Sequence, residues 1–323
     1  DLIDTLNPQA RYCLSIEETG SNTYRVAVTL ILPDGTRNSF RIQRLKNKLG
    51  NKSNASSEIE LDGTVALMVG EPGRGVRTII EMVAQTRLDC VLGSAAGMRQ
   101  SVAEATWHAR HRAAFGATLA DQPAMAAVLA DLALESEAAT VTAMRLARAH
   151  DEDADDTERA FRRLATAVAK YWICKRGPHH AYEALECLGG NGYTEDFPLA
   201  MRYREQPVMA VWEGSGNVIA LDVLRAMTRE PESIAAFDAE VNLARGASTI
   251  LDAHLDNVRA QLSELATLDA SSAQRRARRV VESMALALEA SLLVRFSPTP
   301  VSDAFIEARL GDDRGAEYGT LPV

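Results

Sequence analysis

The fold of this chain is decided by the stretch Val76-Arg-Thr-Ile-Ile-Glu-Met-Val-Ala-Gln-Thr-Arg-Leu-Asp-Cys90, in which apolar side chains recur every three or four positions. The pattern continues to about Ala114, and such spacing gives a helix one apolar face. We therefore predict a long helix over 76–114. The same reasoning predicts helices over 122–150, 157–188 and 215–228, with the one over 157–188 kinked or interrupted at Gly177-Pro178. Long antiparallel helices packed side by side form a bundle.

The residues on either side of this bundle have different patterns. Residues 1–62 contain β-branched and alternating segments, which predict strands over 24–32, 39–45 and 57–61. Residues 231–323 again have helical spacing, which predicts helices over 233–265, 272–294 and 302–310. The expected fold is mainly α: a partial β middle domain over 1–62, a helical bundle over 63–230 and an additional helical domain over 231–323.

Composition limits the classes of protein to which this chain can belong. Its 323 residues are 46% hydrophobic and 24% charged, which is typical of a globular chain. The net charge of −9 argues against a general nucleic-acid-binding protein. No run of about 18 apolar residues predicts a membrane span, and no secretory signal opens the chain, so we expect it in the cytoplasm. Histidine and cysteine spacing predicts no metal site, and four cysteines are expected to be reduced thiols: Cys13, Cys90, Cys174 and Cys187.

A glutamate between an apolar run and a glycine-rich turn is the first candidate for chemistry. In Ala210-Val-Trp-Glu-Gly-Ser-Gly-Asn217, Glu213 directly precedes an expected helix. Burial among apolar neighbours would raise the pKa of this carboxyl and make it a base. Ser215 and the helix N-terminus suit an anion or a polar ring edge. The structural alternative is that Ser215 or Asn217 caps the helix and Glu213 interacts with its dipole.

Two other motifs are compatible with a ligand or with ordinary structure. Leu188-Gly-Gly-Asn-Gly-Tyr193 follows a helix, so it is either a close backbone approach to a ligand or a glycine C-cap. Arg110-His-Arg-Ala-Ala-Phe-Gly116, with Gln122 beyond it, places an arginine at a helix end, where it suits a pyrophosphate. The alternative for that segment is a solvated arginine with Phe115 packed on the helix terminus.

Arg275-Arg-Ala-Arg-Arg279 concentrates four arginines in five residues, a pattern that also occurs where proteins contact phosphates. Residues 231–323 as a whole hold nine arginines and fourteen acidic residues, which gives a net charge of −5. The segment is therefore more typical of a solvated helix face.

The order and spacing of these motifs together resemble the acyl-CoA dehydrogenase superfamily, and within it the branch of DNA alkylation response (AidB-like) proteins. The resemblance covers most of residues 30–228. It is carried by Phe40-Arg-Ile-Gln-Arg-Leu-Lys-Asn-Lys-Leu-Gly-Asn-Lys-Ser-Asn-Ala-Ser56, Thr86-Arg-Leu-Asp-Cys-Val-Leu-Gly-Ser94, Arg112-Ala-Ala-Phe-Gly116, Ile173-Cys-Lys-Arg-Gly177, Leu188-Gly-Gly-Asn-Gly-Tyr193 and Trp212-Glu-Gly-Ser-Gly-Asn217. Residues 231–323 resemble the additional C-terminal helical domain of that branch. The sequence is expected to lack the family's N-terminal helical domain and part of its β domain.

The resemblance implies an FAD-binding protein in which Glu213 removes the α-proton of an acyl-CoA thioester while the β-hydride passes to the flavin. Arg87 matches a position near the acyl-CoA entrance, and Arg225 matches one that reaches the active-site cavity in the same branch. The positions that match cofactor contacts, some of them across a subunit interface, are Arg112, Phe115, Gln122, Glu186, Gly189, Gly190, Ser215 and Asn217.

The sequence thus predicts an FAD-dependent acyl-CoA dehydrogenase-like oxidoreductase. The family resemblance implies a homotetramer, with electron-transfer flavoprotein as a candidate partner. Two alternatives stay open. One is an AidB-like flavoprotein that binds DNA with little dehydrogenase activity, which the negative charge of residues 231–323 disfavours. The other is a truncated, non-catalytic bundle.

Overall fold

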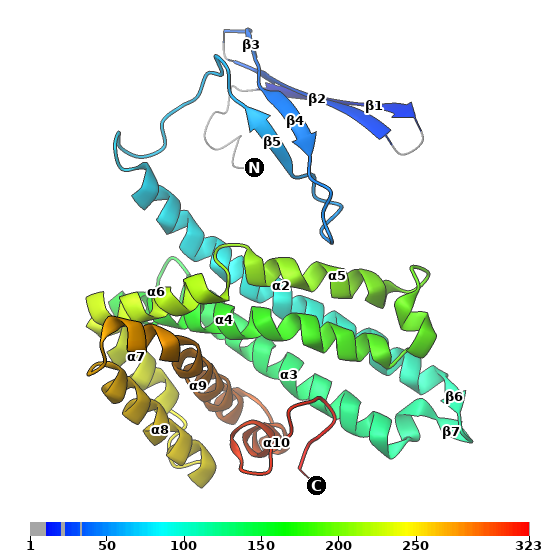
Figure 1. Cartoon of the computed structure of the whole chain (residues 1–323), viewed down its shortest axis with the longest axis vertical. Helices are drawn as coiled ribbons and strands as arrows, with labels where there is room; N and C mark the ends of the chain where they lie inside the picture. Colours follow the sequence, from blue (N-terminus) through cyan, green and yellow to red (C-terminus); the bar gives the residue numbers. More distant parts are fainter. Residues whose placement is uncertain (1–10, 21–22, 33, 323) are drawn as a thin grey trace. The chain divides into compact units, whose positions relative to one another are not determined.

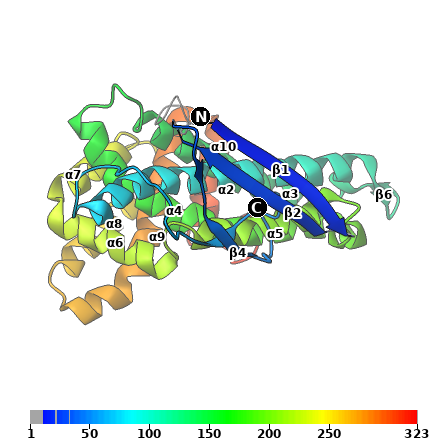
Figure 2. The same cartoon turned by 90° about the horizontal axis from the view of Figure 1, so that it is seen from above.

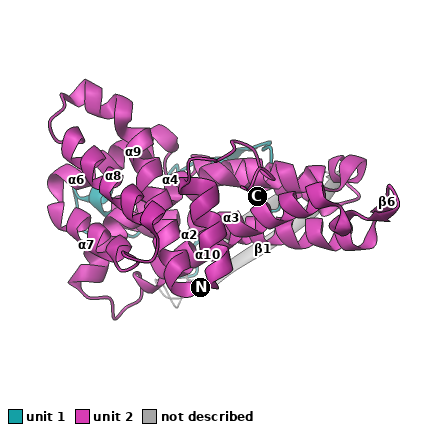
Figure 3. Ribbon diagram, turned by 90° about the horizontal axis from the view of Figure 1, so that it is seen from below, with its two compact units in different colours: residues 1–78 teal, residues 79–323 magenta. Residues whose placement is uncertain are grey.

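The computed structural model of this chain describes residues 11–20, 23–32 and 34–322. The chain divides into two compact units, residues 1–78 and 79–323 (Figures 1 and 3). The described part of the first unit consists mainly of strands, and the second unit consists almost entirely of helices.

The first unit contains two antiparallel sheets, one with the strand order β1-β2-β3 and one formed by β4 and β5. The strands run over Arg11–Gly20 (β1), Thr23–Ile31 (β2), Arg37–Asn38 (β3), Arg41–Leu45 (β4) and Ser57–Glu60 (β5). Three of them, β2, β4 and β5, confirm the strands expected over 24–32, 39–45 and 57–61. The first strand, β1, lies within the region predicted only in general terms to be β.

The second unit is built around a bundle of long helices. They run over Gly75–His111 (α2), Pro123–Arg148 (α3), Asp156–Glu186 (α4), Pro198–Val211 (α5) and Gly216–Arg229 (α6). The central helix, α4, packs against α3, α5 and α6 (Figure 1). Buried side chains such as Val91 of α2, Ala139 of α3 and Leu164 of α4 share one apolar core. The bundle predicted from the apolar periodicity is confirmed.

Two details of the bundle differ from expectation. Helix α4 is not interrupted at Gly177-Pro178, and α5 was not predicted, because its charged residues and Pro207 obscure an apolar period. Packing explains α5, since the amide of buried Gln206 on that helix lies between two glycines. A Cβ on Gly97 would come within 1.9 Å of Gln206 Nε2, and a Cβ on Gly177 within 2.3 Å of its Oε1. The two glycines therefore allow α5 to approach α2 and α4 closely.

The remaining helices pack on the bundle. They run over Pro231–Asn242 (α7), Thr249–Leu265 (α8), Ala270–Phe296 (α9) and Thr299–Leu310 (α10). Helix α9 packs against α3, α4 and α6 of the bundle and against α7, α8 and α10 (Figure 2). The single helix expected over 233–265 is wrong, because the chain turns at Gly246. That residue has a φ of 90°, and its N–H donates to Asp252. The expected domain boundary at residue 230 stays a prediction.

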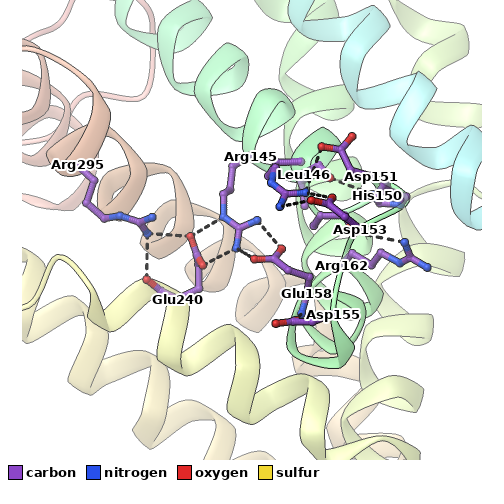
Figure 4. A network of polar contacts seen from close by, with 12 residues as sticks. Arg145, Leu146, His150, Asp151, Asp153, Asp155, Glu158, Arg162, Glu240 and Arg295 are labelled. Atoms are coloured by element: carbon purple, nitrogen blue, oxygen red, sulfur yellow. Dashed lines mark hydrogen bonds and ion pairs between the residues drawn. The ribbon is translucent and has the colours of Figure 1, made fainter.

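A partly buried ion-pair network ties the last helices to the bundle (Figure 4). Arg145 of α3 donates to Glu158 of α4 and to Glu240 of α7, and Arg295 of α9 also donates to Glu240, each at 2.8 Å. Burial raises the pKa of Glu240, but hydrogen bonds from the two arginines outweigh burial and hold it below its usual value. Removing one partner of such a network leaves buried charge uncompensated, so the network fixes α7 and α9 to the bundle.

The structure bears on three expectations, which concern the cysteines, metal sites and membrane-spanning helices. Cys90, Cys174 and Cys187 are free and buried, whereas the side chain of Cys13 lies outside what the structure describes. Over the described ranges, no three His, Cys, Asp or Glu side chains gather in a way that would hold a metal ion. None of the described helices has the length and apolar character needed to cross a membrane. The cytoplasmic location stays a prediction.

Candidate functional site

Glu213 lies in the tight connection between α5 and α6, in a backbone conformation that is rare for a residue with a side chain. Its φ is 59°, in the left-handed region, and Gly214 follows with a φ of 116°. Such a conformation costs about 1–3 kcal/mol and is found mainly at functional sites. Glu213 is only partly buried, which corrects the expectation of a fully desolvated carboxyl. No described side chain forms a hydrogen bond or ion pair with its carboxylate, so that group is available to a ligand.

Two cations from different helices hold the backbone on either side of this strained link. Arg87 of α2 donates from Nε to the carbonyl of Glu213 at 3.1 Å. Lys170 of α4 donates from Nζ to the carbonyl of Gly214 at 2.6 Å. The loop that carries Glu213 is therefore fixed by the bundle and not only by its own helices.

The two arginines expected near the acyl-CoA share a carboxylate on α6. Arg87 Nη1 pairs with Asp222 at 2.5 Å, and Arg225 lies 3.8 Å from the same residue. Burial raises the pKa of Asp222, but its contacts with Arg87 and Arg163 outweigh burial and lower it. The ionised carboxylate thereby fixes Arg87 in the orientation that reaches the Glu213 loop, while most of the Arg225 side chain stays exposed.

Ser215 and Asn217 lie at the start of α6. Ser215 occupies the N-cap position, yet its side chain makes no capping hydrogen bond, so the capping alternative is not observed for this residue. Asn217 is exposed one turn from Glu213. The side chains of Lys175 and Arg278 lie against Gly216. Two cationic side chains therefore lie at the N-terminus of α6, where Ser215 is exposed.

Phe115 lies at the tip of a short hairpin between α2 and α3. The hairpin strands are Ala113–Ala114 (β6) and Ala117–Thr118 (β7). Phe115 and Gly116 have φ values of 56° and 85°, as a two-residue hairpin turn requires. Phe115 is 97% exposed, so the alternative in which it packs on the helix terminus is wrong. The ring of Phe115 is therefore available for a contact outside the described chain, on a turn whose backbone is uncommon for a residue with a side chain.

Arg112 and Gln122 flank this hairpin. Gln122 is the N-cap residue of α3 and donates from Nε2 to the carbonyl of Ala114 at 3.3 Å, which joins it to the hairpin. Arg112 is exposed, and no described carboxylate forms an ion pair with it. Its guanidinium is thus available to an anionic ligand.

The glycine-rich segment after α4 forms a short 3₁₀ helix, η2 (Gly189–Tyr193). Gly189 has a φ of 59°, and a Cβ on Gly189 or Gly190 would meet no atom within 4 Å. Glu186, at the end of α4, accepts a 2.6 Å hydrogen bond from Tyr182. Beside this segment is a cavity of about 390 Å³, lined by Leu188, Phe197 and side chains of α2 that include Trp107. The two open glycines permit a close backbone approach by a ligand.

The structure sorts the predicted site residues into two sets at opposite ends of α5. That helix has 14 residues and is therefore about 20 Å long. Figure 2 shows the hairpin at the far end of α2 and α3 from α6. One set contains Glu213, Arg87, Ser215, Asn217 and Arg225. The other contains Arg112, Phe115, Gln122, Glu186, Gly189 and Gly190.

Sequence analysis missed two residues that shape the first set, Lys170 and Asp222. The sequence did mark Lys170, because it is the one charged residue in the otherwise mostly apolar run Ala165–Cys174. Lysine is almost never fully buried, so a lysine in such a run indicates a specific role. The arginine motif of α9 lies on a solvated helix face, as expected, because Arg275, Arg276, Arg278 and Arg279 are all exposed. Arg276 pairs with Glu264 and Arg275 bonds to serines of its own helix, while Arg278 reaches the start of α6.

Comparison with known proteins identifies the family of the helical bundle. The model of the acyl-CoA dehydrogenase C-terminal domain matches residues 73–228. The chain is 46% identical over 223 residues to the putative acyl-CoA dehydrogenase AidB of Escherichia coli, which is 69% of this chain and 41% of that protein. It is 33% identical over 216 residues to acyl-CoA dehydrogenase family member 11 of Caenorhabditis elegans, which is 66% of this chain and 35% of that protein. The chain thus spans less than half the length of these relatives.

Solved structures show the same fold. ACDH-11 of Caenorhabditis elegans in complex with C11-CoA matches 98% of this chain and 57% of its own, with a TM-score of 0.76 and 26% identity. An acyl-CoA dehydrogenase from Bacillus anthracis complexed with FAD matches 87% of this chain and 55% of its own, with a TM-score of 0.66 and 14% identity. Residues 73–228 are therefore a C-terminal domain of the acyl-CoA dehydrogenase family.

Proposed function

We propose that this chain belongs to an FAD-dependent, acyl-CoA dehydrogenase-like oxidoreductase that introduces an α,β double bond into an acyl-CoA thioester. The observation that carries the proposal is the geometry at Glu213. A carboxylate without a described partner sits on a strained backbone link, and Arg87 and Lys170 hold that link from two other helices. Strain maintained in this way is typical of a group that is held ready for a reaction.

In this proposal Glu213 is the general base. Its carboxylate accepts the α-proton of the thioester. Bound FAD supplies the acceptor for the β-hydride. Arg87 and Arg225 are proposed to lie near the acyl-CoA, as the AidB-like resemblance implies.

The second set of residues fits FAD by its chemistry. Arg112 offers a pyrophosphate a guanidinium with no ion-pair partner among the described residues, and Gly189 and Gly190 leave open backbone for the adenosine part. In the first set, the hydroxyl of Ser215 makes no capping hydrogen bond. This hydroxyl and the amide of Asn217 suit the polar edge of a flavin ring. These chemical matches support FAD as the cofactor.

The distance between the two sets favours an oligomer. Because α5 separates them by about 20 Å, we propose that the hairpin set contacts FAD bound mainly by a neighbouring subunit, in a homotetramer. Exposed Trp107, Phe115 and Tyr193 provide apolar surface that such an arrangement would cover. Electron-transfer flavoprotein is the proposed electron acceptor.

Glu213→Gln tests the function directly, because glutamine keeps the size of the side chain and removes the base. We expect dehydrogenation of an acyl-CoA with an artificial electron acceptor to fall by at least about 100-fold, while flavin stays bound. The matched control is Glu152→Gln, which removes an exposed carboxylate from the loop after α3 and should leave turnover unchanged. Substantial activity in the Glu213 variant would refute the assignment.

A further inference from the structure

Lys170 is a buried cation beside the proposed base. It lies on α4 with 1% of its surface exposed, and its described contact is the hydrogen bond from Nζ to the carbonyl of Gly214. Within the described chain, no carboxylate lies at ion-pair distance from Nζ. Burial lowers the pKa of Lys170, and the negative charge of Glu213 is among the influences that oppose this. Burying an ammonium group without an ion-pair partner is unfavourable, so its presence needs a reason other than stability.

The position of the accepting carbonyl supplies that reason. Gly214 directly follows Glu213, and both residues have positive φ. A strained conformation persists only when its surroundings hold it in place. Arg87 holds the first carbonyl of the pair and Lys170 holds the second, so the direction of the Glu213 side chain is set from two sides.

We propose that Lys170 is a positioning residue for Glu213, and that its hydrogen bond to the Gly214 carbonyl fixes the carboxylate in the direction of the substrate. This inference rests on the function proposed above. Lys170 acts through the backbone of the loop and makes no contact with the reacting atoms. A misplacement of about 1 Å in a catalytic group is sufficient to lower a rate by about 100-fold.

Lys170→Met is the first test, because methionine fills a similar volume and lacks both the charge and the donor. We expect kcat to fall by up to about 100-fold, with KM for the acyl-CoA changed by less than about 3-fold and FAD content unchanged. The control on the same helix is Arg159→Met, which removes an exposed arginine paired with Asp156 and should leave both constants unchanged. Lys170→Arg, which keeps a cationic donor, should recover part of the lost kcat.

Three results from these variants would overturn the proposal. The first is an unchanged kcat in Lys170→Met. The second is loss of FAD or of the fold in that variant, which would make the role of Lys170 structural. The third is an arginine variant no better than the methionine variant, since the donor would then be irrelevant.

Amide hydrogen exchange over residues 212–218 tests the positioning without any turnover. We expect faster exchange at the Gly214 loop in Lys170→Met than in the unaltered chain or in Arg159→Met, because the anchored carbonyl is released. Equal exchange in all three would refute the anchoring role. If the unaltered chain shows no dehydrogenation, the proposed function fails, and this exchange comparison still decides whether Lys170 holds the loop.

Discussion

At the residue scale, Gln206 shows how closely three helices of the bundle approach one another. Its amide lies between Gly97 of α2 and Gly177 of α4, so moving away from one glycine brings it toward the other. We predict that Gly97→Ala lowers the free energy of unfolding by about 1–3 kcal/mol, because the added methyl group overpacks a buried site. Urea denaturation followed by circular dichroism measures the change.

The controls for this prediction lie on the same helices. Gly75→Ala adds a methyl group to α2 where nothing lies within 4 Å, so the free energy of unfolding should change by less than about 0.5 kcal/mol. Gln206→Ala combined with Gly97→Ala should be less destabilised than the sum of the two single changes. If the double variant is destabilised by the full sum of the two single changes, the two side chains do not compete for space.

Single residues differ in how far the sequence predicts their roles. Glu213 was found because its motif places a carboxylate between an apolar run and a glycine-rich helix start. Lys170 was not, because its contact with Gly214 joins residues 44 positions apart and depends on how α4 packs against the α5–α6 connection. The exposure of Phe115 also depends on a backbone turn that the residue types alone leave open.

At the element scale, α7 is held to the bundle by Glu240. We predict that Glu240→Gln lowers the free energy of unfolding by about 3 kcal/mol, because two partly buried arginines lose their shared carboxylate. Asp238→Asn is the matched control on the same helix. Asp238 pairs with the half-exposed Arg259, so its loss should change stability by less than about 1 kcal/mol. Equal effects of the two variants would contradict this interpretation of the network.

The network also gives the stability a dependence on pH. The pKa of Glu240 is lower in the folded chain than its ordinary value of 4.5, so the ionised carboxylate stabilises the fold above that pH. Protonation removes this stabilisation as the pH falls through the folded pKa. The stability difference between the unaltered chain and Glu240→Gln should therefore be largest near neutral pH and shrink under acid conditions.

How well each helix could be predicted depended on how clearly its apolar residues repeat. Helices α2, α3, α4 and α6 have a clear period, and their existence follows from sequence. The unpredicted α5 has its apolar positions interleaved with arginines, and it becomes a helix because α2 and α4 provide a surface for it. The break between α7 and α8 depends on one glycine, Gly246, within a segment of otherwise helical composition.

At the scale of the whole molecule, the exposed hairpin should be covered in an assembly. We predict that Phe115→Asp shifts the chain toward smaller species in sedimentation velocity and lowers FAD retention, because it places a charge on an apolar contact surface. Phe296→Asp, which changes an exposed phenylalanine at the end of α9, should leave both unchanged. The same oligomer in both variants would exclude the hairpin from the interface.

The central claim is that Glu213 removes a proton from an acyl-CoA in a site completed by FAD. The most direct measurement is the visible absorption spectrum of the FAD-loaded chain during anaerobic addition of an acyl-CoA. We predict that the oxidised flavin bands disappear in the unaltered chain and persist in Glu213→Gln. Persistence of the bands in both, or their equal loss in both, would contradict this account.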